Sequence, residues 1–345
     1  MVKMNRSSLC SSVSLSRLAL SSLALAALAA LAACGGGDNE DTPAATSQSV
    51  AVEFVATVGD TPVTCASVLS GLGSGSVNAV IQDLRFYVSN LALINDKGAT
   101  VKVTLDSNAF QLTSGDNTLA LVDLEDDTGA CAGDSALNVK ITGTVPIGTY
   151  TGAKFTLGVP AALNHLDVSA TTTQAPLNNN DMYWSWTTGY KHVKIEINPD
   201  NAAAPGTFTS AIVKSGAATG ANNTSFFFHL GDTSCTVPAG GSAASATCAS
   251  VNTRDIHFHD FDATKKRIAV DLKALFASSN LLSERGGAGG CMSGPTDLEC
   301  QDMWPVLGST FSVDGAGAVT ATSVTVQDAT HGFFHGETVF RPVAK

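Results

Sequence analysis

Histidines are the residues of this sequence best suited to bind a metal ion, and two of them share one short segment. His257-Phe258-His259 lies in an alternating stretch, so both imidazoles would point to the same face of a strand, with Cα atoms about 6.6 Å apart. Asp255 would share that face. Because neutral imidazole binds copper or zinc well, this strand is a candidate for two ligands of one metal ion.

The other histidines lie beside aromatic or apolar residues. His165 follows an apolar Gly-Val-Pro segment, His229 ends the aromatic run 226–228, and His331 and His335 flank a Gly-Phe-Phe tripeptide. For each one taken alone, a surface or hydrogen-bonded core histidine is the alternative. The cupin family also has a His-x-His strand, but cupins need a glutamate about four residues later, where this chain has Ala263.

The most unusual local sequence is the aromatic segment 182–191. Trp184 and Trp186, two of the three tryptophans, are two residues apart and would share one face of a strand. A packing cluster is the alternative, because large aromatic side chains dominate burial energetics. The sequence contains no G-x-S-x-G elbow, P-loop or G-x-G-x-x-G, so the common hydrolase, nucleotide-binding and dinucleotide-binding classes lack support.

Short β-strands are the elements expected to position these residues. Val50, Val52 and Phe54 alternate with smaller or polar residues, and the β-prone run 81–94 is followed by a turn and a returning arm at 101–105, which predicts a hairpin. Further strands are predicted at 119–124, 137–145, 149–157, 192–197, 226–230, 256–261 and 319–326.

Helical signals are few, at 271–278 and near a turn at 66–72. Many short strands with little helix predict an all-β fold, an antiparallel β-sandwich-like single domain over residues 50–345. Such a domain is long for one sandwich, so we expect long loops, at 198–223 and 237–249.

Six cysteines remain when Cys10 and Cys34 are set aside. An even number in an exported chain favours disulfides. Short spacing favours two local pairs among the last four cysteines, which leaves the first two to pair with each other. A thiolate metal site is the alternative, but the sequence has no C-x-x-C pair. The predicted disulfides are Cys65–Cys131, Cys235–Cys248 and Cys291–Cys300.

The first 33 residues predict a signal peptide for export. Positive residues precede an apolar stretch too short for a good transmembrane helix, and the stretch ends in Leu-Ala-Ala-Cys34, which is similar to a bacterial lipobox. We expect lipidation of Cys34, a flexible tether over 34–49, and a periplasmic protein anchored to the membrane. Gly35 follows Cys34 at the position where an aspartate would favour retention in the inner membrane, so the outer membrane is favoured. An ordinary secretory signal is the alternative.

The predicted mature chain is acidic. Removal of residues 1–33 takes away three of the 19 Lys and Arg residues and none of the 30 acidic residues, which leaves a formal charge of −14. An acidic domain repels phosphate backbones, so nucleic acid is not an expected partner.

Several segments together resemble the MbnP-like proteins, the four-Cys-motif member of the metallo-mystery pair system. The resemblance covers about residues 50–310 and departs from the family at His192, where the family has an aromatic residue. The segments that carry it are DLRFYVSN (83–90), LALVDLED (119–126), TLGVP (156–160), LNH (163–165), MYWSW with GYK (182–191), FHLG (228–231) and CMSG (291–294).

The resemblance implies an exported copper-binding protein that is not itself an enzyme. Family members are paired with a MauG-like di-haem cytochrome c peroxidase relative, which oxidises a tryptophan to kynurenine. Carried over to this chain, the modified residue would be Trp184 or Trp186, and the resemblance does not decide between them. His165 and His229 would be copper ligands. His257 and His259 lie outside the matching motifs, and a second metal site on their strand stays open.

Two other function classes remain as alternatives. A copper- or iron-dependent oxygenase would use the His257/His259 strand and would need an open coordination position beside a substrate pocket. A surface β-domain for adhesion or assembly would bind no metal, and its aromatic residues would be core. Metal retention and the state of the tryptophans distinguish the three classes.

Overall fold

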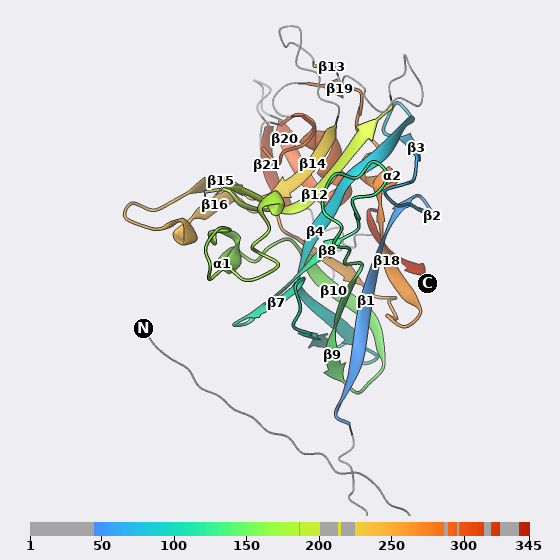
Figure 1. The fold of residues 1–345 in the computed structure, drawn as a ribbon, viewed down its shortest axis with the longest axis vertical. Helices are drawn as coiled ribbons and strands as arrows, with labels where there is room; N and C mark the ends of the chain where they lie inside the picture. Colours follow the sequence, from blue (N-terminus) through green and yellow to red (C-terminus); the bar gives the residue numbers. More distant parts are fainter. Residues whose placement is uncertain are drawn as a thin grey trace, which may run out of the picture. The chain divides into compact units, whose positions relative to one another are not determined.

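Two β-sheets pack face to face in the part of the chain that the structure describes (Figure 1). The computed structural model describes residues 45–185, 187–200, 213–214, 225–285, 289–294, 297–313, 319–324 and 338–345. Cys34, Trp186, His331 and His335 therefore lie outside the described part, as do Cys10, Gly35 and the predicted signal peptide.

The larger sheet has ten strands, and the strands that carry His192, His229 and His257 all belong to it. Its central path runs β11-β12-β4-β10-β17, β14 pairs with the other side of β12, and the remaining strands join through β4 and β8. The strands are β3 (Leu69–Leu72), β4 (Val77–Asn95), β5 (Thr100–Lys102), β7 (Gln111–Ser114), β8 (Asn117–Asp123), β10 (Tyr150–Leu157), β11 (Tyr183–Ser185), β12 (Gly189–Pro199), β14 (Phe226–Gly231) and β17 (Arg254–Phe258).

The smaller sheet has six strands in the order β22-β18-β1-β9-β6, with β2 paired to β1. The β1–β18 pair is parallel, an exception to the otherwise antiparallel pairing of this sheet. Its strands are β1 (Ser47–Val58), β2 (Thr61–Pro62), β6 (Thr104–Leu105), β9 (Lys140–Pro146), β18 (Lys266–Asp271) and β22 (Phe340–Ala344).

The other elements of the described part are short ribbons, helices and 3₁₀ turns. Three two-stranded ribbons are formed by β13 (Val213–Lys214) with β19 (Ser283–Glu284), β15 (Thr233–Thr236) with β16 (Thr247–Ser250), and β20 (Ser309–Val313) with β21 (Val319–Val324). The helices are α1 (Ala161–Asn164), α2 (Leu272–Leu275) and α3 (Cys300–Met303), and the 3₁₀ turns are η1 (Asn180–Met182), η2 (Ala243–Ser245) and η3 (Pro305–Leu307). None of the helices in the described residues is long and apolar enough to cross a membrane.

Four phenylalanines form the centre of the sandwich. Phe54 and Phe340 come from the smaller sheet, and Phe86 and Phe155 come from the larger one. Their rings meet edge to face with centroids 5.4 to 6.2 Å apart. Since all four are almost fully buried, the two sheets share one continuous core.

Substitution of Phe155 by alanine should lower the free energy of unfolding by about 3–5 kcal/mol, because it leaves a cavity between the sheets. Chemical denaturation followed by fluorescence measures the effect. The control is Val68→Ala, since Val68 is 53% exposed and its truncation should cost less than about 0.5 kcal/mol. Equal effects at the two positions would contradict a core between the sheets.

The all-β fold predicted from the sequence is confirmed, with three local differences. The predicted returning arm at 101–105 splits into β5, which pairs with β4, and β6, which pairs with β9 of the other sheet. Val103 lies between them, buried, with its N–H donating to Leu91. The 237–249 segment, predicted as a loop, contains β16, which pairs with β15. Strand β1 also begins at Ser47, before the predicted boundary at Val50.

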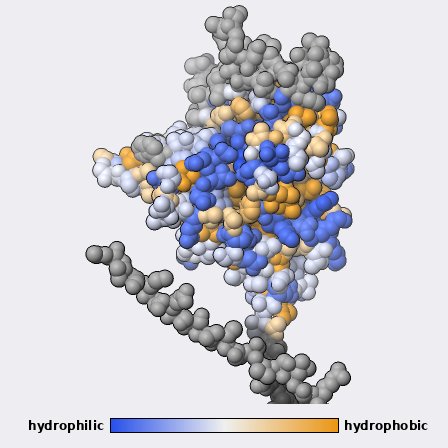
Figure 2. All heavy atoms as spheres, in the orientation of Figure 1, coloured by the Kyte–Doolittle hydropathy of each residue, from blue (hydrophilic) through white to orange (hydrophobic). Residues whose placement is uncertain are grey.

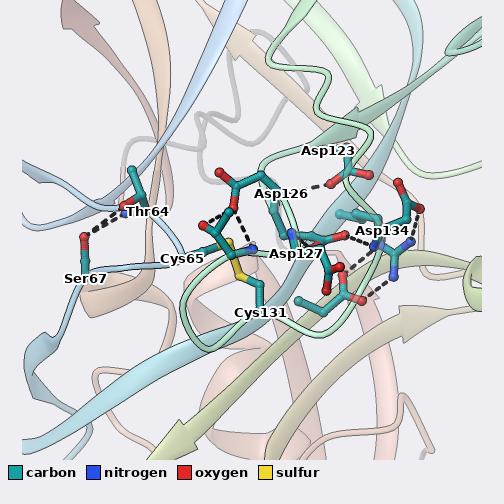
Figure 3. Close-up of a disulfide and its surroundings, with 12 residues drawn as sticks. Thr64, Cys65, Ser67, Asp123, Asp126, Asp127, Cys131 and Asp134 are labelled. Atoms are coloured by element: carbon teal, nitrogen blue, oxygen red, sulfur yellow. Dashed lines mark hydrogen bonds and ion pairs between the residues drawn. A yellow bond between two sulfur atoms is a disulfide. The ribbon is translucent and has the colours of Figure 1, made fainter.

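The structure contains the three disulfides that the spacing favours. Cys65–Cys131 joins the loop before β3 to the acidic loop after β8, and Figure 3 shows Asp126 and Asp127 beside this bridge. Cys235–Cys248 is a cross-strand pair between β15 and β16, and Cys291–Cys300 closes a short segment before α3. These bridges hold loops, whereas the sheets are held by the core.

The surface is mixed on the face that Figure 2 shows, with hydrophilic residues interrupting the hydrophobic ones. The large apolar residues that are exposed are scattered over different segments: Val68, Leu137, Val139, Ile147 and Val251. Residues 45–345 form one compact unit.

Candidate metal site

The outer face of the larger sheet carries polar side chains where the inner face carries the core. On β12, Val193 and Ile195 face the core, and the alternate residues Lys194 and Glu196 face outward. On β14 the same alternation buries Phe228 inside and turns His229 outward. Strand period thus brings His229 and two charged side chains of β12 to one face.

His229 is held by a carboxylate and keeps one ring nitrogen unused. Its Nε2 lies 2.8 Å from Glu196 Oε1, and its buried Nδ1 has no hydrogen-bond partner among the described residues. Burial lowers the pKa of His229, which favours the neutral imidazole, although the Glu196 contact opposes this shift. Burial would raise the pKa of Glu196, but the His229 hydrogen bond and Lys194 outweigh it and lower that pKa. The pair is therefore a carboxylate bonded to a neutral imidazole.

Such an arrangement is the one that metal-binding histidines use. The carboxylate fixes Nε2 as the donor and leaves the Nδ1 lone pair for an ion. The ring itself is held from two sides, since Phe227 stacks on it at 5.3 Å and the Trp184 ring lies 6.4 Å away, measured between centroids.

His165 is also buried with an unused nitrogen. It is the residue that ends α1, it is 5% exposed, and its Nδ1 has no partner among the described residues. Its Nε2 lies 3.5 Å from Cys248 Sγ. Ligand atoms of His165, Cys235 and Cys248 lie within 4.8 Å of one another, but the two sulfurs form a disulfide and are not thiolates. Only the imidazole remains as a ligand there.

The hairpin that carries Trp184 contacts the neighbours of both histidines. It consists of β11 and β12, paired through Tyr183 and Tyr190. On one side, Asn164 Oδ1 accepts from Tyr190 N at 2.9 Å, and a Cβ at Gly189 would lie 2.3 Å from the Asn164 carbonyl oxygen. Gly189 also has φ +80°, so this close approach requires glycine.

On the other side of the hairpin, the half-buried Trp184 ring lies against the backbone of β14. A Cβ at Gly231 would lie 2.5 Å from Trp184 Cζ3, so the absence of a side chain at Gly231 makes room for the indole. Trp184 is thus the tryptophan that the structure places beside His229. The position of Trp186 lies outside the described residues.

Asp232 joins the His165 side to β14. It accepts from Asn164 Nδ2 at 3.0 Å and from Asn252 N at 2.7 Å, and it lies 3.1 Å from His192 Nε2. His192 Nδ1 accepts from Val159 N at 3.2 Å, so both nitrogens of His192 are used. His192 is therefore a positioning residue rather than a metal ligand in this arrangement.

His257, on β17, and His259, just after its end, form a separate pair. Their ring centroids are 4.2 Å apart, as expected for a His-x-His strand, with His257 buried and His259 exposed. Strands β12, β4 and β10 separate β17 from β14, which corresponds to about 19 Å between these two strands at the usual strand spacing. His257 and His259 therefore lie apart from His229, and metal binding by this pair stays a prediction.

The carboxylates on the outer face already surround a cation. Arg85, fully buried, contacts both oxygens of Asp83 and lies 3.4 Å from Asp134, while Lys194 Nζ lies 2.6 Å from Asp83. Asp134 also forms a group with Asp123 and Glu125 that is close enough for an ion. Since the positive charge of Arg85 already lies among these carboxylates, this group is a poorer candidate for a metal site than the histidines.

Comparison with known proteins gives one family and one solved structure. The MbnP family model matches residues 47–293. The structure of MbnP from Methylosinus trichosporium is similar, with a TM-score of 0.71 and 29% sequence identity, over 87% of this chain and 99% of that one. A search of curated proteins finds no match. The family match supports the prediction of a non-enzymatic role. On the extent of the sequence match and the shared fold, the chain belongs to the MbnP family.

Proposed function

We propose that this protein is an exported, lipid-anchored copper-binding protein in which His165 and His229 supply the metal ligands. The proposal rests on two buried imidazoles whose Nδ1 atoms have no hydrogen-bond partner among the described residues. Trp184 lies beside His229, and Asn164, next to His165, bonds to the same hairpin. A buried polar atom without a partner needs a reason, and an ion is one.

The donor set fits copper. Imidazole nitrogen is a good ligand for copper, and the neutral form that burial favours at His229 is the form that binds a metal. Copper bound there would supply a redox-active centre. The protein contributes the geometry: Glu196 orients His229, and α1 together with the Cys235–Cys248 ribbon holds His165.

We further propose that a MauG-like di-haem partner of the cytochrome c peroxidase family oxidises a tryptophan of this hairpin to kynurenine. With hydrogen peroxide as oxidant, the indole C2–C3 bond is cleaved, each of these carbons gains an oxygen atom, and peroxide is reduced to water. Hydrolysis then releases C2 as formate. Trp184 is a candidate because its ring is half-buried at the proposed site, and Trp186 is the other.

Export and anchoring rest on the sequence. The leader over 1–33 and the Leu-Ala-Ala-Cys34 motif support a lipid anchor, with the outer membrane favoured. Three disulfides are consistent with an oxidising compartment such as the periplasm.

Peptide mass spectrometry and metal analysis of protein purified from its native host test the proposal. We expect copper in the sample and, on the peptide with Trp184 and Trp186, the loss of one carbon and gain of one oxygen. If copper is present and the tryptophans are unmodified, the proposal of a haem partner is wrong. If copper and modification are both absent, the alternative of a domain for adhesion or assembly is favoured.

Glu196→Gln should weaken copper binding by about 10–100-fold, because it removes the carboxylate that orients His229. Competition with a copper chelator measures the affinity. Glu53→Gln is the matched control, since Glu53 lies on β1 of the other sheet and bonds to Lys345. An unchanged affinity of the Glu196 variant would show that His229 is not held for a metal by this carboxylate.

A further inference from the structure

Four carboxylates gather around the segment that the Cys291–Cys300 disulfide closes. Glu284 comes from β19, Asp297 and Glu299 precede α3, and Asp302 lies within it. Glu284 is fully buried and Glu299 is 2% exposed. Burial raises the pKa of Glu284 and of Asp297, and the charge of Glu299 adds to both shifts. The cluster therefore resists full ionisation by itself.

Two of the carboxylate oxygens receive no hydrogen bond from a described donor group. Glu284 Oε2 accepts from Gly290 N at 2.7 Å, and Glu299 Oε1 accepts from Arg285 N at 2.6 Å. The other oxygens, Glu284 Oε1 and Glu299 Oε2, are buried and receive no hydrogen bond from a donor group of the described residues, and the Glu284 and Glu299 carboxyl groups lie close enough to share a proton. An ionised carboxylate only accepts, so these two oxygens require a bound cation or a proton shared between them.

The charges of the cluster are not balanced by the side chains that the structure describes. Among these, Arg285 is the one cation that contacts the cluster, at 3.2 Å from Glu299 and 2.8 Å from Asp302. Lys214 pairs with Glu284 through the backbone of β13 and β19. Within the described part, one positive charge thus faces four acidic side chains.

We infer that Glu284 and Glu299 ligate a divalent cation of the hard, oxygen-preferring kind, with Ca²⁺ as the expected ion. Carboxylate oxygens are the ligands that Ca²⁺ prefers, and it tolerates irregular ligand sets completed by water and backbone carbonyls. A cavity of about 270 Å³ lined by Ser283, Asn280 and Asp302 reaches Glu299 and provides a path for the ion.

The ion would brace the strand that carries His229. Gly290, which bonds to Glu284, precedes Cys291, whose N–H donates to the Phe227 carbonyl and whose carbonyl accepts from His229 N at 2.9 Å. Met292 N donates to Asp297. The cluster therefore fixes the segment that pairs with β14. The inference does not depend on copper, because it rests on the carboxylates alone.

Calorimetric titration and thermal unfolding of the chelator-treated protein with CaCl₂ test the inference. We expect saturable binding of one Ca²⁺ and a rise in Tm of about 5 °C or more at a hundredfold excess over Kd. Glu284→Gln and Glu299→Gln should each remove the rise. Glu53→Gln, a partly exposed replacement on the other sheet, and His229→Ala should keep it, which separates this site from the copper site.

The opposite result would identify a shared proton. If wild-type protein binds no Ca²⁺ and Glu284→Gln is as stable as the wild type or more stable, an amide has replaced a protonated carboxyl and the cation site does not exist. Binding of Ca²⁺ that survives both glutamine substitutions would place the ion elsewhere and would also overturn the inference.

Discussion

His229→Ala is expected to reduce copper affinity by more than about 100-fold, because it removes a direct ligand, whereas loss of an outer contact alone costs about 10–100-fold. His165→Ala should have an effect of the same size for the same reason. The two substitutions should not add fully, since a site that has lost one imidazole gains little from the other. Copper is quantified after equilibration against a chelator of known affinity.

Folding of these variants must be separated from metal binding. Both side chains are nearly buried, so circular dichroism and the unfolding transition of the copper-free variants serve as controls. A His257→Ala/His259→Ala double variant is the matched comparison, since it removes two imidazoles at the far edge of the sheet. If the double variant loses the tightly bound copper and His229→Ala keeps it, the site lies on β17 and the account is wrong.

Removal of the Cys65–Cys131 disulfide should lower the free energy of unfolding by about 4 kcal/mol. The bridge spans 66 residues, and in the chain-entropy model a longer closed loop restricts the unfolded chain more. A Cys65→Ala/Cys131→Ala variant measures this by denaturant unfolding under oxidising conditions. Both cysteines are buried beside the acidic loop after β8 (Figure 3), so part of the loss would come from packing.

The Cys235–Cys248 pair is the control for this prediction. It spans 13 residues, and its removal should cost about 3 kcal/mol, less than that of the longer loop. Because His165 Nε2 contacts Cys248 Sγ, this second variant should also weaken copper binding, whereas the Cys65/Cys131 variant should not. A larger stability loss from the shorter loop would contradict the entropic explanation.

The strands and disulfides could be predicted because their signals are local. Alternation marks the buried face of β14 at Phe226 and Phe228, and an even cysteine count with short spacings favours two of the bridges. The His257/His259 pair follows from the strand period alone, and the rings do lie together. The sandwich follows from the number of short strands, but not its parallel β1–β18 pair, which joins segments more than 200 residues apart.

The partners of the histidines could not be predicted. Glu196 meets His229 only because β12 and β14 pair in one register, with a shift between Lys191 and Val193. Asp232 reaches Asn164 across 68 residues of chain. Glu196 lies in an alternating Lys-x-Glu pattern that is also typical of a solvated strand face, so no local signal distinguished it.

Anomalous diffraction at the copper edge from crystals of the copper-loaded protein tests the central claim most directly. We expect one strong anomalous peak within bonding distance of His165 and His229, next to the Trp184 hairpin. A peak at His257 and His259 with none at His165 and His229 would contradict it, and so would copper held only by surface carboxylates.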